Sequence, residues 1–397
     1  MTLTHHRRVA ECWQRSVQHS FDTLGNARQG QGLGLHDLEG DSSLGHSRKW
    51  QKNTITIGSD GVDSQSLLKG GSMDATISED KPVLSVIMPV HHGERFIGHA
   101  LASIADQVPP SEGKTIEVLA IEMANDSPSL EIARTFSDRI RLHLIVRPDL
   151  RMWHEKTNLG VSQAAADHVC WLHQDDFWLP GRFNTVRKWI SEAPGAALHI
   201  APSCFVDAKG ASLGLWRCPF DATGPLPPEK FLRRLLVQNF VAAPAPVFRK
   251  DAWLHCGGLD ENLWYTADWD IWLKLAGQGE TYFHEEACTA FRVHGSSLTV
   301  SGSRDFEDFT SQLRIVLERH ITALSETARK TIGPLAETSM RINAALARAS
   351  AGDMSQLPGS LGAMISLGPF GLTQLLRDSR LVERVGARVR AKLRGSM

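Results

Sequence analysis

The chain lacks several features that would place it in a common class. Its six cysteines are scattered without a Cys-x-x-Cys pair, so neither a zinc site nor a disulfide framework is predicted. Lys and Arg total 43 against 44 Asp and Glu, and this balance gives no overall attraction for nucleic acid. No apolar run approaches the roughly 20 residues of a membrane span, and residues 1–10 lack the apolar core of a secretory signal. These absences predict a cytoplasmic protein with reduced thiols and no nucleic-acid partner.

The chain nevertheless has enough material for a large core. It has 397 residues, of which 42% are hydrophobic, so more than one structural unit is expected. From about residue 25 to residue 80 the sequence is dominated by Gly, Ser, Asp, Gln and His without a regular hydrophobic period. We therefore predict that residues 1–80 are a disordered, low-complexity extension.

Strand and helix patterns alternate after this extension. Strands are predicted at 83–90, 116–121, 142–146 and 168–172, helices at 96–104, 130–136 and 269–275, and further short strands near 197–201, 245–249 and 289–293. This alternation predicts an α/β fold with a mixed, mostly parallel sheet and helices on both faces. From residue 306 the pattern is helical, with a Gly/Ser/Pro-rich break at 351–368.

The final segment, 375–394, reads as one basic amphipathic helix. Its apolar positions are Leu376, Val382, Val385, Val389 and Leu393, and seven Arg or Lys side chains lie mostly elsewhere. Such a helix can lie on an anionic membrane surface. It can equally dock on the core with its basic face in solvent, and the sequence leaves both interpretations open.

Acidic side chains follow the fourth predicted strand. Asp175 and Asp176 end an apolar run, and ligands of open α/β sheets bind beyond the carboxyl ends of strands. Oxygen ligands suit Mg²⁺ or Mn²⁺, which can stabilise the charge on a departing nucleoside diphosphate. His294 could complete the metal shell from a later loop, and Arg292 could face the diphosphate. An Asp-Asp pair by itself can also be an N-cap or a turn.

Two further acids precede the predicted helix at 269–275. Asp268 is the candidate general base, because an acceptor hydroxyl must lose its proton as it attacks the anomeric carbon. Asp270 lies two positions later, where capping of the helix is the favoured interpretation. A metal-dependent phosphohydrolase also uses clustered acids, but the acids here are too few and too dispersed for two ions.

Taken together, these motifs resemble the family 2 glycosyltransferases over residues 83–299. The matching segments, in order, are Leu84–Val90, Glu117–Glu122, His173–Asp176, Thr266–Leu273 and Arg292–His294. The resemblance implies a GT-A fold at 81–303, followed by a helical extension at 304–397. It also implies an inverting, metal-dependent enzyme that moves a sugar from a nucleotide-sugar donor to a saccharide or lipid-linked acceptor in cell-surface polysaccharide or glycan synthesis. Its place would be the cytoplasm, at the inner face of the plasma membrane if segment 375–394 binds lipid.

The resemblance also implies roles for single residues. It implies Mg²⁺ or Mn²⁺ held by Asp175, Asp176 and His294, Asp268 as catalytic base, and a donor site formed by Pro89, Val90, Glu122, Asn158, Asp175 and Arg292. Glu122 would contact the base of the nucleotide.

The chain departs from the family pattern at several places. His173 replaces the first Asp of the Asp-x-Asp motif, and Ala267 replaces a Glu. Between Ser162 and the strand at 168, only residues 163–167 stand where the family has a full helix with an Arg-Asn pair. A catalytically impaired, nucleotide-binding or scaffold protein with the same fold is therefore the alternative hypothesis.

Overall fold

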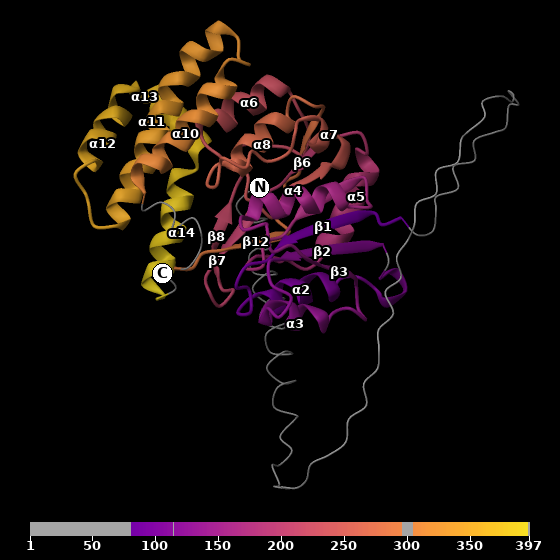
Figure 1. Ribbon diagram of the computed structural model, residues 1–397. Coiled ribbons are helices and arrows are strands. Elements are labelled where there is room, and N and C mark those ends of the chain that lie inside the picture. The colour runs from indigo at the N-terminus through magenta and orange to yellow at the C-terminus, as the bar shows by residue number, and fades with distance from the viewer. Residues whose placement is uncertain (1–80, 114, 296–304, 396–397) are drawn as a thin grey trace, which may run out of the picture. The chain divides into compact units, whose positions relative to one another are not determined.

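The computed structural model describes residues 81–113, 115–295 and 305–395 (Figure 1). The predicted disorder of residues 1–80 concerns a segment outside the described residues. Within these ranges, strands and helices are interspersed from β1 to β12, and helices alone follow from residue 305.

The larger of two sheets begins with four parallel strands. These are β1 (Leu84–Pro89), β2 (Ile116–Glu122), β3 (Arg141–Val146) and β4 (His168–Trp171), in the order β3-β2-β1-β4. Beyond β4 the sheet continues through β10 (Val247–Arg249), β6 (Leu198–Ile200), β11 (Thr281–Phe283) and β9 (Gly224–Leu226). Strand β10 is antiparallel to both neighbours, and β11 is parallel to β6. The predicted mixed, mostly parallel sheet is confirmed.

Alternation along β1 explains why helices cover both faces of this sheet. Ile87 packs into one apolar cluster with Ile121, whereas Val86 and Met88 pack into another with Val118. The first cluster includes side chains of α4 (Trp153–Gln163), α6 (Pro228–Val237) and α8 (Ala267–Leu275). The second includes α2 (Ile97–Ala105), α3 (Pro128–Arg134) and α5 (Arg182–Glu192). All six residues of β1 are buried, as expected of a central parallel strand.

Helix α4 was not predicted from the sequence. As expected, no separate helix begins between Ser162 and the strand at 168, but α4 occupies Trp153–Gln163 and includes that serine. The hydrophobic period is weak because Lys156 and His154 are buried among the apolar positions. The strand-helix-strand topology is therefore intact, and only the linker at 164–167 is short.

A second, four-stranded sheet has the order β5-β12-β7-β8. It consists of β5 (Phe177–Trp178), β12 (Thr289–Arg292), β7 (Ser203–Val206) and β8 (Ser212–Trp216). Strand β5 pairs antiparallel with β12, with Phe177 opposite Ala290. This pairing brings the loop that precedes β5 to the carboxyl end of β12.

The C-terminal helices are α10 (Phe306–Ile321), α11 (Glu326–Ser350), α12 (Leu357–Ser366), α13 (Gly368–Ser379) and α14 (Leu381–Leu393). Helix α12 forms inside the predicted 351–368 break, so that break is shorter than expected. The single helix expected at 375–394 is instead divided at Arg380, whose φ of 50° is left-handed. Helix α7 (Lys250–His255) completes the elements used below.

Helix α14 docks on the second sheet, as one of the two sequence interpretations expected, but through its basic side rather than with that side in solvent. Arg390 donates to the Leu213 carbonyl and Arg394 to Asp207, and Ala387 and Ala391 are fully buried. Three of its apolar side chains face outward instead, with Val382 72%, Val389 51% and Leu393 82% exposed. In the described residues, no helix combines the length and apolar character needed to cross a membrane.

Candidate active site

The first part of the site lies at the carboxyl ends of β1 and β2. Glu122 is buried there, and its carboxylate accepts hydrogen bonds from the Met123 N–H and, at 3.2 Å, from the Ser127 hydroxyl. The Lys156 ammonium lies 3.9 Å from Glu122 and donates to the Val90 carbonyl at 2.6 Å. Burial lowers the pKa of Lys156, while the charge of Glu122 acts to raise it. The predicted donor residues Pro89, Val90 and Glu122 therefore share one buried edge with a lysine.

Lys156 is a site residue that the sequence did not reveal. It stands on α4 in a polar run with no recognisable motif. Burial of a lysine indicates a site only once the helix that carries it has been located, and the weak hydrophobic period hides this helix in the sequence.

The second part of the site joins the loop after β4 to the end of β12. The Asp175 carboxylate lies 2.9 Å from Nε2 of His294. The Asp175 side chain is 24% exposed, whereas that of His294 is 7% exposed. Burial would raise the pKa of Asp175, but the hydrogen bond from His294 and the nearby charge of His173 lower it overall. The structure thus brings together two of the three predicted metal ligands.

Asp176 points away from that pair and into the protein. Its carboxylate accepts the backbone N–H of Arg292 at 2.9 Å, and the residue is only 2% exposed. Burial and the adjacent charge of Asp175 hold the pKa of Asp176 well above its usual range. This geometry joins β5 to β12 and leaves Asp176 poorly presented to a ligand.

Arg292 also makes its contacts inside the protein. Its Nε donates to the Asp175 carbonyl at 2.6 Å, and a terminal nitrogen donates to the Ala208 carbonyl at 3.0 Å. Its other terminal nitrogen lies 2.9 Å from Nδ1 of His99. Burial, followed by the charge of Arg292, lowers the pKa of His99 to about 4, so this imidazole is neutral and accepts the bond. The guanidinium holds the backbone of Asp175 in place.

Asp268 stands in the first turn of α8. Its carboxylate accepts the Trp269 N–H at 2.7 Å and the Asn239 side-chain amide at 3.0 Å. Burial raises the pKa of Asp268 to about 6, against the lowering effect of these hydrogen bonds. A carboxyl group that titrates near neutrality suits proton transfer. Asn239 orients it from the loop after α6.

Asp270 belongs to a buried ion cluster. Its carboxylate lies 2.8 Å from Arg319, 2.7 Å from Lys274 and 2.7 Å from His320. Burial alone would raise its pKa, but hydrogen bonds from His320 and Lys274 lower it to about 2. Its partners on α10 give Asp270 a structural role in joining α8 to the C-terminal helices.

Trp153 connects the two halves of the site. Its ring lies 5.3 Å from that of His173, and its indole N–H donates to the Trp264 carbonyl at 3.1 Å. Trp264 precedes Asp268 by four residues, and His173 precedes Asp175 by two residues. The first residue of α4 thus bridges the loop of the metal-ligand candidates and the loop of the base candidate.

Asn158, a predicted donor residue, is held by a glycine turn. Its side chain accepts the Leu259 N–H at 2.9 Å and donates to the Leu259 carbonyl at 3.0 Å. Gly258 in this turn has φ of 69°, and a Cβ added there would lie 2.7 Å from the Asn158 side-chain oxygen. These contacts tie α4 to the segment after α7.

A divalent metal is implied by the resemblance, and the side chains present fit it in part. No group of three His, Cys, Asp or Glu side chains suited to one ion occurs among residues 81–113, 115–295 and 305–395. Asp176 is engaged with Arg292, as described above. Asp175 supplies a carboxylate oxygen, which suits Mg²⁺ or Mn²⁺, and His294 supplies an adjacent imidazole nitrogen. These two side chains are the ones that fit.

Comparison with known proteins shows which family the chain resembles. Residues 85–250 match the sequence model of the family described as Glycosyl transferase family 2. The resemblance to family 2 glycosyltransferases is confirmed. An uncharacterized glycosyltransferase of Rickettsia typhi is 21% identical over 241 residues, covering 57% of this chain and 69% of that protein. An uncharacterized protein of Mycobacterium tuberculosis is 24% identical over 217 residues, covering 50% of this chain and 64% of that protein.

Solved structures confirm the GT-A fold. The crystal structure of S. aureus TarS 1–349 in complex with UDP-GlcNAc aligns with a TM-score of 0.53 and 16% identity. The alignment covers 78% of this chain and 89% of that one. The family 2 match ends at residue 250, so Asp268, Arg292 and His294 lie beyond it.

Proposed function

We propose that the protein is an inverting glycosyltransferase that moves a sugar from a nucleotide-sugar donor to a hydroxyl of a saccharide or lipid-linked acceptor. The observation that carries this proposal is the pairing of Asp175 with His294 beside the carboxyl ends of β1, β2 and β4. The family match and a related fold that binds UDP-GlcNAc support a nucleotide-sugar donor.

The chemistry follows from the positions of these side chains. The acceptor hydroxyl would give its proton to Asp268 while its oxygen attacks the anomeric carbon. The bond from that carbon to the diphosphate breaks, the nucleoside diphosphate departs, and attack from the opposite side inverts the configuration. Asn239 holds Asp268 in orientation, and Arg292 fixes the backbone of Asp175.

A metal ion is part of the proposal. Asp175 and His294 would hold Mg²⁺ or Mn²⁺, which when bound neutralises charge on the departing diphosphate. Glu122, with Lys156 beside it, would contact the nucleoside from the ends of β1 and β2. Pro89 and Val90 would form the adjoining wall of the donor site, and Asn158 would support it by holding the segment at Leu259.

The test is release of nucleoside diphosphate from a panel of sugar nucleotides, with Mn²⁺, with Mg²⁺ and with chelator. We expect turnover with at least one donor and its loss on chelation. Asp138→Asn, a substitution of an exposed carboxylate in the turn after α3, serves as the matched control. Undiminished turnover in Asp268→Asn would remove the assigned base.

A catalytically impaired nucleotide-binding protein is the second candidate. It is favoured by Ala267, which replaces the family's Glu, and by the burial of Asp176 against Arg292. Calorimetry distinguishes the two functions. Nucleoside diphosphate binding without transfer or hydrolysis of any donor would support the impaired protein.

Membrane contact through 375–394 is a further part of the proposal. It now depends on the outward apolar side chains Val382, Val389 and Leu393, because the basic side of α14 faces the second sheet. The expected place of action is the cytoplasmic face of the membrane. Flotation with anionic vesicles tests this, and substitution of all three side chains by Ser should reduce the floated fraction.

A further inference from the structure

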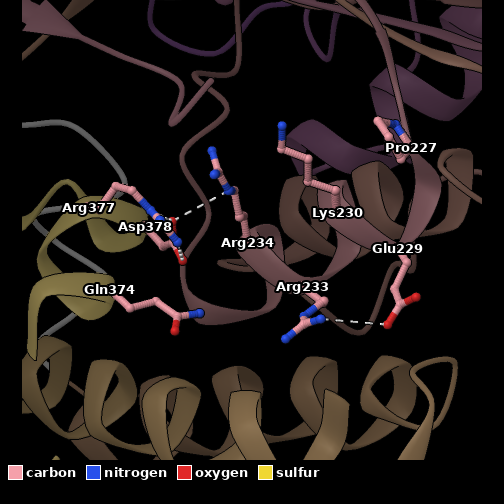
Figure 2. A pocket seen from close by; sticks show the side chains of 8 residues that line it. All are labelled: Pro227, Glu229, Lys230, Arg233, Arg234, Gln374, Arg377 and Asp378. Atoms are coloured by element: carbon pink, nitrogen blue, oxygen red, sulfur yellow. Dashed lines mark hydrogen bonds and ion pairs between the residues drawn. The ribbon is translucent and has the colours of Figure 1, made fainter. Parts of the chain in front are cut away.

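A cavity of about 390 Å³ lies between α6 and α13, and neither the proposed mechanism nor the family motifs use it. Its lining, shown in Figure 2, comprises Pro227, Glu229, Lys230, Arg233, Arg234, Gln374, Arg377 and Asp378. Four of these eight residues are cationic and two are acidic. The volume is within the range of small-molecule sites in proteins.

The two acids leave cationic nitrogens available. Asp378 is fully buried and accepts two hydrogen bonds from Arg377, at 2.7 and 3.0 Å. Glu229 lies 3.9 Å from Arg233 at the exposed rim. Within the part of the chain that the structure describes, no hydrogen bond or ion pair of Lys230 occurs, and Figure 2 shows its side chain directed to the same side of α6 as that of Arg234. The lining therefore carries a local positive excess.

Arg234 is the most constrained of these cations. Its side chain is only 13% exposed, its guanidinium carbon lies 5.1 Å from the centre of the Phe220 ring, and its Nε lies 3.7 Å from Asp378. Its Nη1 is buried without a hydrogen-bond partner among the described residues, although buried polar nitrogens in folded proteins nearly always have one. The Arg234 guanidinium, which lines the cavity, therefore has unused donor capacity.

We propose that this cavity binds a phosphate group, with Arg234 and Lys230 as its donors and the charge of Arg233 at its rim. Phosphate oxygens accept hydrogen bonds from a planar guanidinium, and Lys provides a flexible point charge. A bound phosphate satisfies Arg234 and offsets the positive excess. The site is separate from the donor site, so the proposal does not depend on the proposed glycosyl transfer.

Occupation of the cavity would join α13 to α6. Arg377 and Asp378 lie on α13, whereas Lys230, Arg233 and Arg234 lie on α6. Helix α6 leads directly to Asn239, the partner of Asp268. The phosphate belongs either to a free small molecule or to a lipid headgroup, and the two sources share the same recognition chemistry.

The first experiment measures binding of inorganic phosphate to the full chain by calorimetry, with nucleoside diphosphate present to fill the donor site. In Lys230→Gln/Arg233→Gln we expect affinity to fall by at least about tenfold, which corresponds to the loss of one charge-assisted hydrogen bond. Lys188→Gln, which removes an exposed cation on α5, should leave affinity unchanged. Arg234→Lys keeps the positive charge but removes the planar set of guanidinium donors, and should also weaken phosphate binding.

Hydrogen exchange locates the ligand, and vesicles identify its source. Phosphate should slow exchange in α6 and α13 of the parent protein and not in the double variant. Vesicles of phosphatidylcholine with phosphatidic acid provide the second arm. Protection by vesicles without binding of inorganic phosphate supports the headgroup, and the reverse supports a free ligand. Equal binding of both probes by the parent and the double variant would overturn the proposal, as would binding of neither probe by the parent.

Discussion

Asp175 and His294 lie 119 positions apart in the chain, and their side chains meet at 2.9 Å. The antiparallel pairing of β5 with β12 produces this contact, because Asp175 precedes one strand and His294 follows the other. The Arg292 backbone N–H on Asp176 and the Arg292 side chain on the Asp175 carbonyl hold the two loops together. A pair built in this way has a defined geometry before any ligand binds.

Removal of either member of this pair should therefore impair turnover. We expect Asp175→Asn and His294→Gln each to lower kcat by at least about 100-fold, the order of effect of losing one stabilising group at a developing charge. Both should also raise the Mn²⁺ concentration needed for half-maximal rate. The measurement is nucleoside diphosphate release against Mn²⁺ concentration, with Asp138→Asn as control. Unchanged metal dependence in both variants would exclude them as ligands.

The raised pKa of Asp268 predicts a pH profile. Because the base must be ionised, kcat/KM should rise with pH up to about 6 and then level off. Asp268→Asn should lose about 10²- to 10⁴-fold in rate together with that rising limb. The control is nucleoside diphosphate affinity, which this substitution should leave unchanged. A profile that keeps its rise near pH 6 in the variant would assign the titration to another group.

The ion cluster around Asp270 should contribute to the free energy of unfolding. Its folded-state pKa of about 2 lies below that of an unfolded aspartate, so its contribution is present above about pH 4 and is lost as pH falls toward 2. Loss of one partner from a buried ion cluster costs about 3–5 kcal/mol, which is the destabilisation expected for Asp270→Asn at neutral pH. Denaturant unfolding measures it. Asp251→Asn removes an exposed partner of Arg249 and should change stability by less than about 1 kcal/mol.

Gly258→Ala should loosen the connection between α4 and the segment after α7. The alanine would have to keep a left-handed backbone, and its Cβ would lie 2.7 Å from the Asn158 side-chain oxygen. We therefore expect the free energy of unfolding to fall by about 1–3 kcal/mol. Gly181→Ala also has a positive φ, of 90°, but its added Cβ has no atom within 4 Å. Comparison of the two variants by thermal unfolding separates backbone strain from collision with Asn158. Equal losses would show that Asn158 accommodates the methyl group.

Sequence patterns predicted the sheet well where burial is uniform. The strands at β1, β2, β3 and β4 were each located to within one or two residues, because β-branched runs bounded by turns have few other interpretations. Helix α4 escaped prediction because it buries Lys156 and His154, which obscures the apolar period. Helix α14 was oriented wrongly, because a basic stripe was assumed to face solvent or lipid, whereas Arg390 and Arg394 bind backbone and carboxylate of the second sheet.

The sequence by itself determined the α/β fold and the residue types of the candidate site, since strand period and acidic motifs depend on neighbours along the chain. Only the tertiary structure decided how those residues are used. In the folded protein Asp175 contacts His294, and Asp176 is buried and accepts the Arg292 N–H. The Arg292 side chain donates to the Asp175 carbonyl, and Asp270 lies in an ion cluster with Arg319. These outcomes depend on which strands pair and which carbonyls need donors, and contacts across more than a hundred positions leave no local pattern in the sequence.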